Sequence, residues 1–346
     1  MKTYLMKKAM IETAVDQGIK AMEDDPKRSV RRLTDLGSQF SNNRFQDMLF
    51  SVMQELLDNE NSAYYDMIQN LLKNTDHEVI KKFGVNFGYM GWNYGAALIR
   101  ENESKLGFCI PWTLLLRYDP SCSSGLGEEK LAKLFEEGQE LGIYTYFIRE
   151  NAHETDDSYA LLELMERYKD CAFVWLKGNG RLTAAQIQSL KLCKGTLLSL
   201  PVEDPETMLS ISLLIDQGIP FALHMEYDGS ETMLPDNDKA LIIDKVLASE
   251  TAFFFLIGKD NATVSAGKLA HDSRMEQNHP FVTMDYYYDG TEVSKMLCEH
   301  PYLLELDVDG TIIHPNEKKG EPFPFELSLQ EALKQTMSPF PIKKEA

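Results

Sequence analysis

The chain has 346 residues, 43% of them hydrophobic, which is enough to bury a sizeable core and is not the composition of a disordered protein. Its 54 acidic and 35 basic side chains give a formal charge of −19, which repels nucleic-acid phosphates and anionic membrane surfaces. The longest apolar runs are too short to span a bilayer, no secretory leader is visible, and five irregularly spaced cysteines favour reduced thiols. We therefore expect a cytoplasmic protein that binds neither nucleic acid nor membrane.

The N-terminal part of the chain, residues 1–104, has the periodicity of helices. Apolar side chains recur three and four residues apart in residues 45–57 and again in residues 64–72. A glycine-rich and aromatic stretch, GYMGWNYG at residues 88–95, joins this part to the rest of the chain. We expect an all-helical N-terminal region that ends near residue 104.

Beyond residue 105, short apolar runs alternate with amphipathic segments. The runs begin 23 to 32 residues apart, which suits successive strand–helix units of a parallel sheet. They lie at residues 111–117, 143–149, 172–177, 196–202 and 219–227. The first segment between them has one apolar stripe, formed by Leu131, Leu134, Phe135, Gly138 and Leu141. Strands this apolar are covered on both faces, as in α/β barrels, whose functional groups follow the carboxyl ends of the strands.

The last third of the chain continues the pattern less regularly. Residues 251–258 and 281–287 read as further strands. Residues 302–315 read as a hairpin around Asp309-Gly310, a strong turn dipeptide, and residues 327–337 as a short amphipathic helix. We expect the sheet to extend beyond residue 250 and the tail to fold as a hairpin plus a helix.

Several segments, taken in chain order, resemble radical S-adenosylmethionine (radical SAM) proteins, in particular a group with a helical N-terminal extension and a C-terminal auxiliary-cluster segment of the SPASM type. The segments are NFGYMGWNYG, GFCIPWTLLLRYDPSCSSG, GQELGIYTYFI, YKDCAFVWLKGNGRL, LIDQGIPFALHMEYDG, PFVTMDYYYDG, LDVDGTIIHP and SLQEALKQTMSPF. The resemblance implies an α/β fold built as a partial (β/α) TIM-like barrel. It also implies three domains: a helical extension at 1–104, a barrel at 105–295, and a remnant of the auxiliary-cluster segment, a hairpin plus helix, at 296–346.

The cluster-binding motif of that family is degenerate in this chain. Radical SAM enzymes hold three irons of a [4Fe–4S] cluster through CxxxCxxC after the first strand, and the fourth iron binds SAM. Here Asp119 stands near the first ligand position, Cys122 is the one cysteine, and Gly125 stands near the third position. Because one thiolate is a poor match for three irons, we expect neither the cluster nor SAM as a cofactor. Cys122 is expected to be a relic rather than a reactive thiol, since no histidine is near it in sequence.

Two further cofactor elements of the family are altered. Arg149-Glu150-Asn151-Ala152 stand where the family has GGEP, which presents backbone groups to SAM, and side chains there would intrude on the ligand. Cys298 remains near one ligand position of the auxiliary cluster, but Asn316 replaces another expected cysteine. Three altered elements together indicate abandoned chemistry, so we expect no catalytic residue of the family reaction.

The vacated cavity is the place where we expect a ligand. It is predicted to be rimmed by Arg149, Glu150, Lys177, His224 and Glu226. Of these, Arg149 and Lys177 could receive a carboxylate or a phosphate.

His224 and Glu226 leave two interpretations open. The period of two in residues 219–227 puts both on one face of the strand, where they could bind a metal or act as acid and base. They could equally form a buried hydrogen-bonded pair, which we favour, so no metal site is predicted. Cys109, Cys171 and Cys193 lie in or beside apolar segments and are predicted to be core residues.

The leading hypothesis is therefore a non-catalytic radical SAM-like protein, a pseudoenzyme. It would bind a peptide or a small molecule in the vacated cavity, or pair with an intact radical SAM relative. One alternative is an enzyme of another class that uses His224 and Glu226. The other alternative is a protein that binds SAM without a cluster.

Overall fold

The computed structural model describes residues 2–39, 44–122, 125–151, 159–227, 236–259, 263–313 and 320–340. The chain divides into two compact units, here called the first unit and the second unit. The first unit comprises Met1–Val85, Asn179–Thr183 and Leu198–Asp289, and the second unit comprises Asn86–Gly178, Ala184–Leu197 and Gly290–Ala346. Each unit contains helices and parallel strands, which confirms the predicted α/β class.

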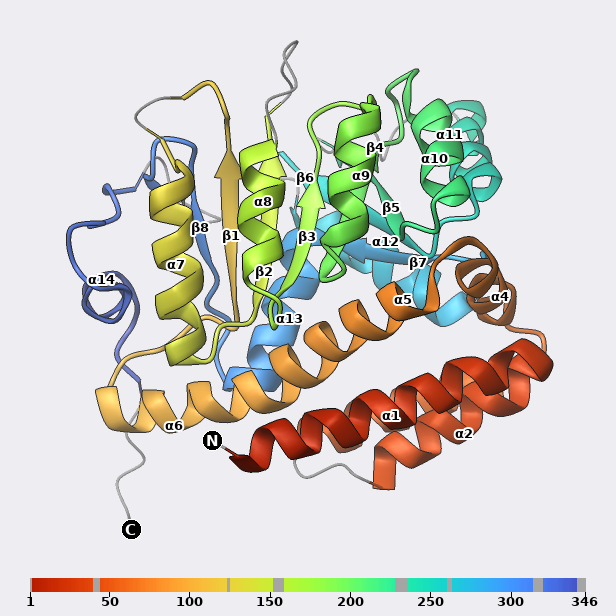
Figure 1. The fold of residues 1–346 in the computed structure, drawn as a ribbon, viewed down its shortest axis with the longest axis horizontal. Helices are drawn as coiled ribbons and strands as arrows, with labels where there is room; N and C mark the ends of the chain where they lie inside the picture. The colour runs from red at the N-terminus through yellow and green to blue at the C-terminus, as the bar shows by residue number, and fades with distance from the viewer. Residues whose placement is uncertain are drawn as a thin grey trace. The chain divides into compact units, whose positions relative to one another are not determined.

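The N-terminal part of the first unit is helical, as the periodicity predicts. Its helices are α1 (Lys2–Asp24), α2 (Pro26–Gln39), α3 (Arg44–Asp58), α4 (Tyr64–Asn74) and α5 (His77–Gly84). Helices α1 and α2 lie side by side (Figure 1). The chain changes direction between these two helices, and local residues start α2. The Asp25 carboxylate accepts a hydrogen bond from the backbone N–H of Arg28, and Pro26 occupies the first helical position.

The strands of the first unit run parallel in the order β7-β6-β5-β4. They are β4 (Thr196–Pro201), which belongs to this unit from Leu198 onward, β5 (Phe221–Tyr227), β6 (Phe253–Gly258) and β7 (Val282–Asp285). The helices that follow the first three of these strands are α10 (Thr207–Asp216), α11 (Asp236–Ser249) and α12 (Thr263–Glu276).

One predicted strand ends earlier than expected. We predicted a strand over residues 281–287, but β7 stops at Asp285 and helix α13 (Tyr286–Cys298) begins at the next residue. The reason is that the Asp285 carboxylate accepts the backbone N–H groups of Tyr287 and Tyr288, as a helix N-cap does. Local capping therefore overrides the strand propensity of two tyrosines.

The second unit has the strand order β3-β2-β1-β8-β9, parallel except for the pair β8–β9. Its strands are β1 (Thr113–Tyr118), β2 (Thr145–Glu150), β3 (Ala172–Leu176), β8 (Leu304–Leu306) and β9 (Ile312–Ile313). Each of the five strands predicted between residues 111 and 227 is present, with bounds within two residues of the prediction. The predicted hairpin is confirmed as β8–β9, with Gly310 in the left-handed region at φ +82°.

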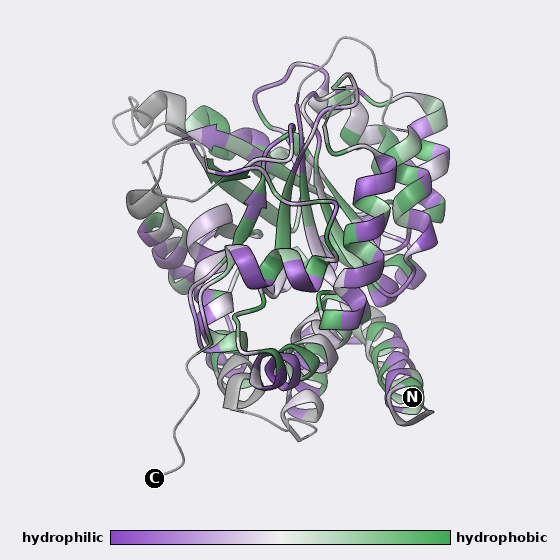
Figure 2. Cartoon of the chain, turned by 90° about the vertical axis from the view of Figure 1, so that its left-hand side faces the viewer, coloured by the Kyte–Doolittle hydropathy of each residue, from purple (hydrophilic) through white to green (hydrophobic). Residues whose placement is uncertain are grey.

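Helices α7 (Glu128–Leu141), α8 (Tyr159–Arg167) and α9 (Ala184–Leu192) cover one face of β1, β2 and β3 (Figure 1). The apolar stripe predicted for residues 128–141 is buried at all five positions. The predicted tail helix is α14 (Leu329–Thr336), which Ser328 and Glu331 begin with a reciprocal capping box. Figure 2 shows the consequence of this patterning: hydrophobic residues concentrate along the strands, whereas the helices carry both hydrophobic and hydrophilic residues.

The glycine-rich stretch at residues 88–95 lies in a π-helix, η1 (Val85–Gly95), which helix α6 (Ala96–Leu106) follows directly. Gly95 and Gly142 pack backbone against backbone here, since a Cβ on either residue would collide with the carbonyl oxygen of the other. Gly142 also ends α7 at φ +104°, where a residue with a side chain is strained. Within the described residues, none of the helices is both long and apolar enough to cross a bilayer.

Candidate functional site

The carboxyl ends of β1 and β2 place two arginines next to each other in the second unit. Arg117 of β1 pairs in register with Arg149 of β2. Side chains of register partners in neighbouring strands point to the same face of the sheet, so the two guanidinium groups share a face. The sequence shows a matching pattern, since in both strands three apolar residues are followed by an arginine as the second-to-last residue. That repeat was the available signal for Arg117, which our sequence prediction did not include.

A buried carboxylate accompanies these arginines. The Nε–H of Arg117 donates to Oε1 of Glu305 in β8 at 2.9 Å. Glu305 is buried, whereas Arg117 and Arg149 are both partly exposed. The site therefore combines two guanidinium groups with one carboxylate, and guanidinium groups bind carboxylates and phosphates through paired hydrogen bonds. We call Arg117, Arg149 and Glu305 the arginine site.

The other face of the same strands packs against helices. Tyr146 of β2 and Phe173 of β3 contact Phe135 of α7, with ring centroids 4.5 Å and 5.1 Å from it. The Tyr146 hydroxyl also donates to the carbonyl of Ile143 at 3.0 Å. Because side chains alternate along a strand, Glu150 and Trp175 belong to this helix-covered face. This agrees with the hydrogen bond that the Trp175 indole N–H donates to Oε2 of Glu150 at 2.7 Å.

The predicted set Arg149, Glu150 and Lys177 is therefore divided between two faces of the sheet. Glu150 is buried on the helix-covered face, and Lys177, two residues after Trp175, is fully buried. Arg149 points to the opposite face, beside Arg117. This differs from the sequence prediction, which placed all three around one cavity. The difference arises because consecutive residues of a strand point to opposite faces of the sheet. A position at a strand end does not by itself show whether the side chain points to the helix-covered face or to the opposite face.

The loop after β1, where radical SAM enzymes bind their cluster, is held by its own polar contacts. Oδ1 of Asp119 accepts hydrogen bonds from the backbone N–H and the hydroxyl of Ser121, at 2.9 Å and 2.7 Å. Oδ2 of Asp119 accepts one from the side-chain amide of Asn151 at 3.3 Å. Cys122 is partly exposed, and its backbone N–H donates to the carbonyl of Asp119. The aspartate therefore organises the turn.

Gly125, the residue near the third cluster-ligand position, leaves no room for a side chain. A Cβ placed on Gly125 would collide with the carbonyl oxygen of Val308 and would lie 3.0 Å from Sγ of Cys122. The backbone N–H of Leu126 donates to the same carbonyl at 3.0 Å, which holds the loop against the turn between β8 and β9. The donor set of this loop does not fit a [4Fe–4S] cluster, because it offers one sulfur and its third position admits only glycine.

Cys298, the cysteine that remains near an auxiliary-cluster position of the family, is a core residue. Cys298 is buried at the end of α13. Burial raises the pKa of its thiol well above the usual value, and the negative charge of Glu103 raises the pKa further. Asn316, the other residue of this prediction, lies outside the described residues.

In the first unit, His224 and Glu226 each have a defined partner. The hydroxyl of Ser199 lies 3.0 Å from Nδ1 of the buried His224. Oε2 of the partly exposed Glu226 lies 3.4 Å from Nζ of Lys259. The strand register places Ser199 opposite Ala222, so these side chains share a face with His224 and Glu226, as the period of two predicts. Whether this pair has a role in binding or catalysis stays a prediction.

All five cysteines are described, and all are free thiols. Cys109, Cys171 and Cys193 are buried, which confirms their assignment to the core. Burial is the main cause that raises the pKa of Cys109 to about 11 and that of Cys193 to about 12, with smaller contributions from Glu103 and Glu166. Loss of the thiol proton is therefore disfavoured at neutral pH for Cys109 and Cys193 in the absence of a metal.

Among the residues that the structure describes, one group of potential metal ligands brings three donor atoms within 4.8 Å of one another: Glu103, Cys109 and His300. Sequence reasoning missed this group. Cys109 was assigned to the core, and His300 lies 197 positions from Glu103, so no local spacing marks the three residues as a set.

No protein-family model matches the chain. No curated protein matches it in sequence either. Among solved structures, the fold is similar to that of Streptococcus suis SuiB bound to S-adenosylmethionine, with a TM-score of 0.51 and 11% identity over 67% of this chain and 66% of that one. SuiB in a second crystal structure gives a TM-score of 0.49 and 12% identity over 86% of this chain and 77% of that chain.

At such low identity, this similarity shows the fold alone. The fold is an α/β arrangement of mostly parallel strands with a helical N-terminal region, and it resembles the partial TIM barrel of radical SAM enzymes. The predicted fold class is thereby confirmed. The chain spans slightly less than two thirds of the length of the SAM-bound SuiB structure.

Proposed function

We propose that this chain is a non-catalytic protein on a radical SAM-like fold, which does not assemble the iron–sulfur cluster and binds an anionic ligand at its arginine site. The observation that carries the proposal is the packing of Gly125 against Val308 and Cys122, because it removes the space that a third thiolate ligand would need. The Asp119 carboxylate, which the turn already engages, supports the same conclusion. Five free thiols suit a cytoplasmic location.

The arginine site supports a ligand with a carboxylate or phosphate group. A guanidinium group presents its N–H donors in a planar fork that matches the two oxygens of such a group. Arg117 and Arg149 lie side by side, and Glu305 engages Nε of Arg117. A small organic acid, a phosphorylated compound or the carboxyl end of a peptide would meet this requirement.

Anaerobic reconstitution with iron and sulfide is expected to leave the protein without a cluster. The reason is that one thiol in the loop cannot hold three irons. The measurement is acid-labile sulfide and iron per chain, together with the visible spectrum. The variant Cys122→Ser serves as the control and is expected to give the same values as the wild type. Uptake of about four irons and four sulfides per chain by the wild type would show that the proposal is wrong.

Inorganic phosphate, added at constant ionic strength, is expected to raise the melting temperature of the wild type. The variant Arg149→Gln should bind phosphate about tenfold more weakly or worse, since a charge-assisted hydrogen bond contributes about 1.5–3 kcal/mol. The variant Arg167→Gln is the matched control, because Arg167 is an exposed arginine of the same unit whose partner is Glu128. It should respond to phosphate as the wild type does.

Two results of this titration would contradict the proposed ligand class. A wild-type protein that phosphate fails to stabilise would have no anion site, and an equal response of all three proteins would locate the anion elsewhere. Parallel titrations with SAM address the alternative of SAM binding without a cluster. Stabilisation by SAM that persists in Arg149→Gln would favour that alternative over the arginine site.

A further inference from the structure

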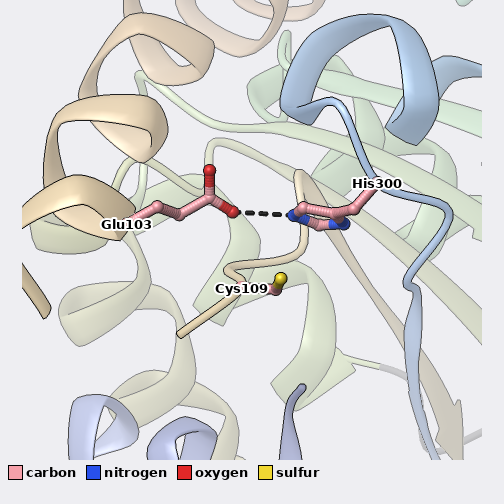
Figure 3. Close-up of side chains that lie close together, drawn as sticks. All are labelled: Glu103, Cys109 and His300. Atoms are coloured by element: carbon pink, nitrogen blue, oxygen red, sulfur yellow. Dashed lines mark hydrogen bonds and ion pairs between the residues drawn. The ribbon is translucent and has the colours of Figure 1, made fainter. Parts of the chain in front are cut away.

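Glu103, Cys109 and His300 form a compact group of three different donor atoms inside the second unit. Figure 3 shows the three side chains directed toward one another, with Glu103 on α6, Cys109 on the segment before β1 and His300 on the turn after α13. One carboxylate oxygen, one sulfur and one ring nitrogen lie within 4.8 Å of each other. The exposed fractions of the three residues are 0%, 1% and 6%, so the group is shielded from solvent.

The Glu103 carboxylate has one oxygen with partners and one without. Its Oε1 accepts the backbone N–H of Ile110 at 2.8 Å and lies 2.7 Å from Nε2 of His300. Its Oε2 is buried and makes no hydrogen bond. A buried carboxylate oxygen without a donor or a cation carries a large desolvation penalty, so this atom is an acceptor that lacks its partner.

A backbone hydrogen bond orients the imidazole ring of His300. The backbone N–H of Tyr302 donates to Nδ1 at 3.3 Å, so the ring proton is on Nε2, between the imidazole and the carboxylate. The residue before it, Glu299, is held in the left-handed region at φ +61°, which is unfavourable for a residue with a side chain. The backbone thus holds the imidazole against Glu103 in a conformation that an isolated chain would avoid.

We propose that Glu103, Cys109 and His300 bind a divalent cation that accepts mixed sulfur, nitrogen and oxygen ligands, and that Zn²⁺ is the cation that fits best. A thiolate ligand disfavours Mg²⁺ and Ca²⁺, which take oxygen ligands, whereas zinc is commonly bound by this combination of donors. The Cys109 thiolate and the Glu103 carboxylate balance the charge of the ion, so the buried site is neutral overall. The unpartnered Oε2 acquires a cation as its neighbour.

Binding requires two proton movements. The Cys109 thiol loses its proton to solvent as the sulfur–metal bond forms. The proton on Nε2 of His300 leaves that nitrogen and the ring takes up a proton at Nδ1, so that Nε2 can donate its lone pair to the metal. The hydrogen bond from Tyr302, which is long at 3.3 Å, is given up in exchange. Three side chains then fill three positions of a tetrahedral site.

The ion would connect segments that are distant in sequence. Helix α6, the segment leading into β1 and the turn between α13 and β8 each supply one ligand. The backbone N–H of Cys109 also donates to the carbonyl of Ser338, which brings the residues after α14 to the same place. A bound ion is therefore expected to stabilise the folded second unit, because the unfolded chain does not present the ligands together.

Metal binding by the full-length protein tests this proposal. Bound metal is first removed from the protein with a chelator. Zn²⁺ binding is then measured by titration calorimetry, and the melting temperature is measured separately with and without Zn²⁺. We expect one Zn²⁺ per chain and a higher melting temperature with the ion. Co²⁺ in place of Zn²⁺ should give the absorption of a cobalt–thiolate bond.

The variants Cys109→Ser, His300→Gln and Glu103→Gln should each bind Zn²⁺ about tenfold more weakly or worse, and Cys109→Ser should remove the cobalt–thiolate absorption. The controls are Cys193→Ser, which alters another buried cysteine, and Cys122→Ser, which alters the partly exposed one. Both should bind as the wild type does. Because a carboxylate variant could fail to fold, Cys109→Ser is the decisive variant.

Three results would overturn the proposal: a wild-type protein that binds no Zn²⁺, unchanged binding in Cys109→Ser, or loss of binding in Cys122→Ser. The proposal is independent of the proposed function. Acid-labile sulfide reports on an iron–sulfur cluster, whereas this titration is done without sulfide, so the failure of one proposal is distinguishable from the failure of the other.

Discussion

The variant Gly142→Ala is expected to be less stable than the wild type by about 3 kcal/mol or more, the sum of two separate penalties. The first penalty is conformational: Gly142 ends α7 at φ +104°, and a side chain disfavours a positive φ by about 1–2 kcal/mol. The second penalty is steric: the new Cβ would lie 2.6 Å from the carbonyl oxygen of Gly95 and 2.9 Å from the backbone nitrogen of Ile99. Backbone atoms cannot rotate away as a flexible side chain can.

Urea unfolding of Gly142→Ala and Gly107→Ala separates the two penalties. Gly107 ends α6 at φ +78°, but a Cβ there meets nothing within 4 Å. Its variant is therefore expected to lose only the conformational part, about 1–2 kcal/mol. If the two variants lose the same free energy of unfolding, then the steric penalty at Gly142 is absent, and the backbones of Gly95 and Gly142 are not in close contact.

The variant Glu305→Gln is expected to have two opposite effects, a loss of stability and a gain in anion binding. Glu305 is 2% exposed and forms an ion pair with Arg117. Because the Arg117 side chain that remains is partly exposed and the amide keeps an acceptor oxygen, the cost is below that of a fully buried pair, and we expect a loss of about 1–3 kcal/mol in the free energy of unfolding. With the carboxylate gone, Arg117 and Arg149 attract phosphate more strongly.

The control for this variant is Glu101→Gln on α6, which removes an exposed ion pair with Lys105. Such a surface pair contributes at most about 1 kcal/mol, so its loss should change stability little and leave the affinity for phosphate unchanged. Urea unfolding and phosphate titration are measured on both variants. If Glu305→Gln binds phosphate more weakly than the wild type, then Glu305 assists anion binding rather than competing with it, and the arginine site is wrongly assigned.

The elements of this fold follow from features that act over a few residues. Alternating or continuous apolar runs predicted β1 to β5 to within two residues, because a buried strand needs apolar side chains wherever the chain crosses the core. The turn at Asp309-Gly310 and helix α14 were also predicted, the first from its turn dipeptide and the second from its apolar periodicity, because both signals lie within a few residues. The early end of β7 at Asp285 was missed because capping and strand propensity competed over the same residues.

The candidate sites depended on the register between strands, which the sequence by itself did not determine. The position of Arg149 at a strand end was predicted. Its pairing with Arg117 follows from the register between β1 and β2, whereas its separation from Glu150 follows from the alternation of side chains along β2. A shift of one residue would reverse every side chain, so this assignment required the three-dimensional structure.

Sequence and tertiary structure thus answered different questions about this protein. The sequence by itself determined the α/β class, the apolar faces of the helices and the shortage of thiols in the loop after β1, because these depend on residue type and short-range periodicity. Only the tertiary structure decided that Gly125 packs against Val308, and that Glu103 and His300 meet beside Cys109. The physical reason is that packing brings together atoms from segments distant in the chain, whereas a sequence pattern reports only on neighbours along it.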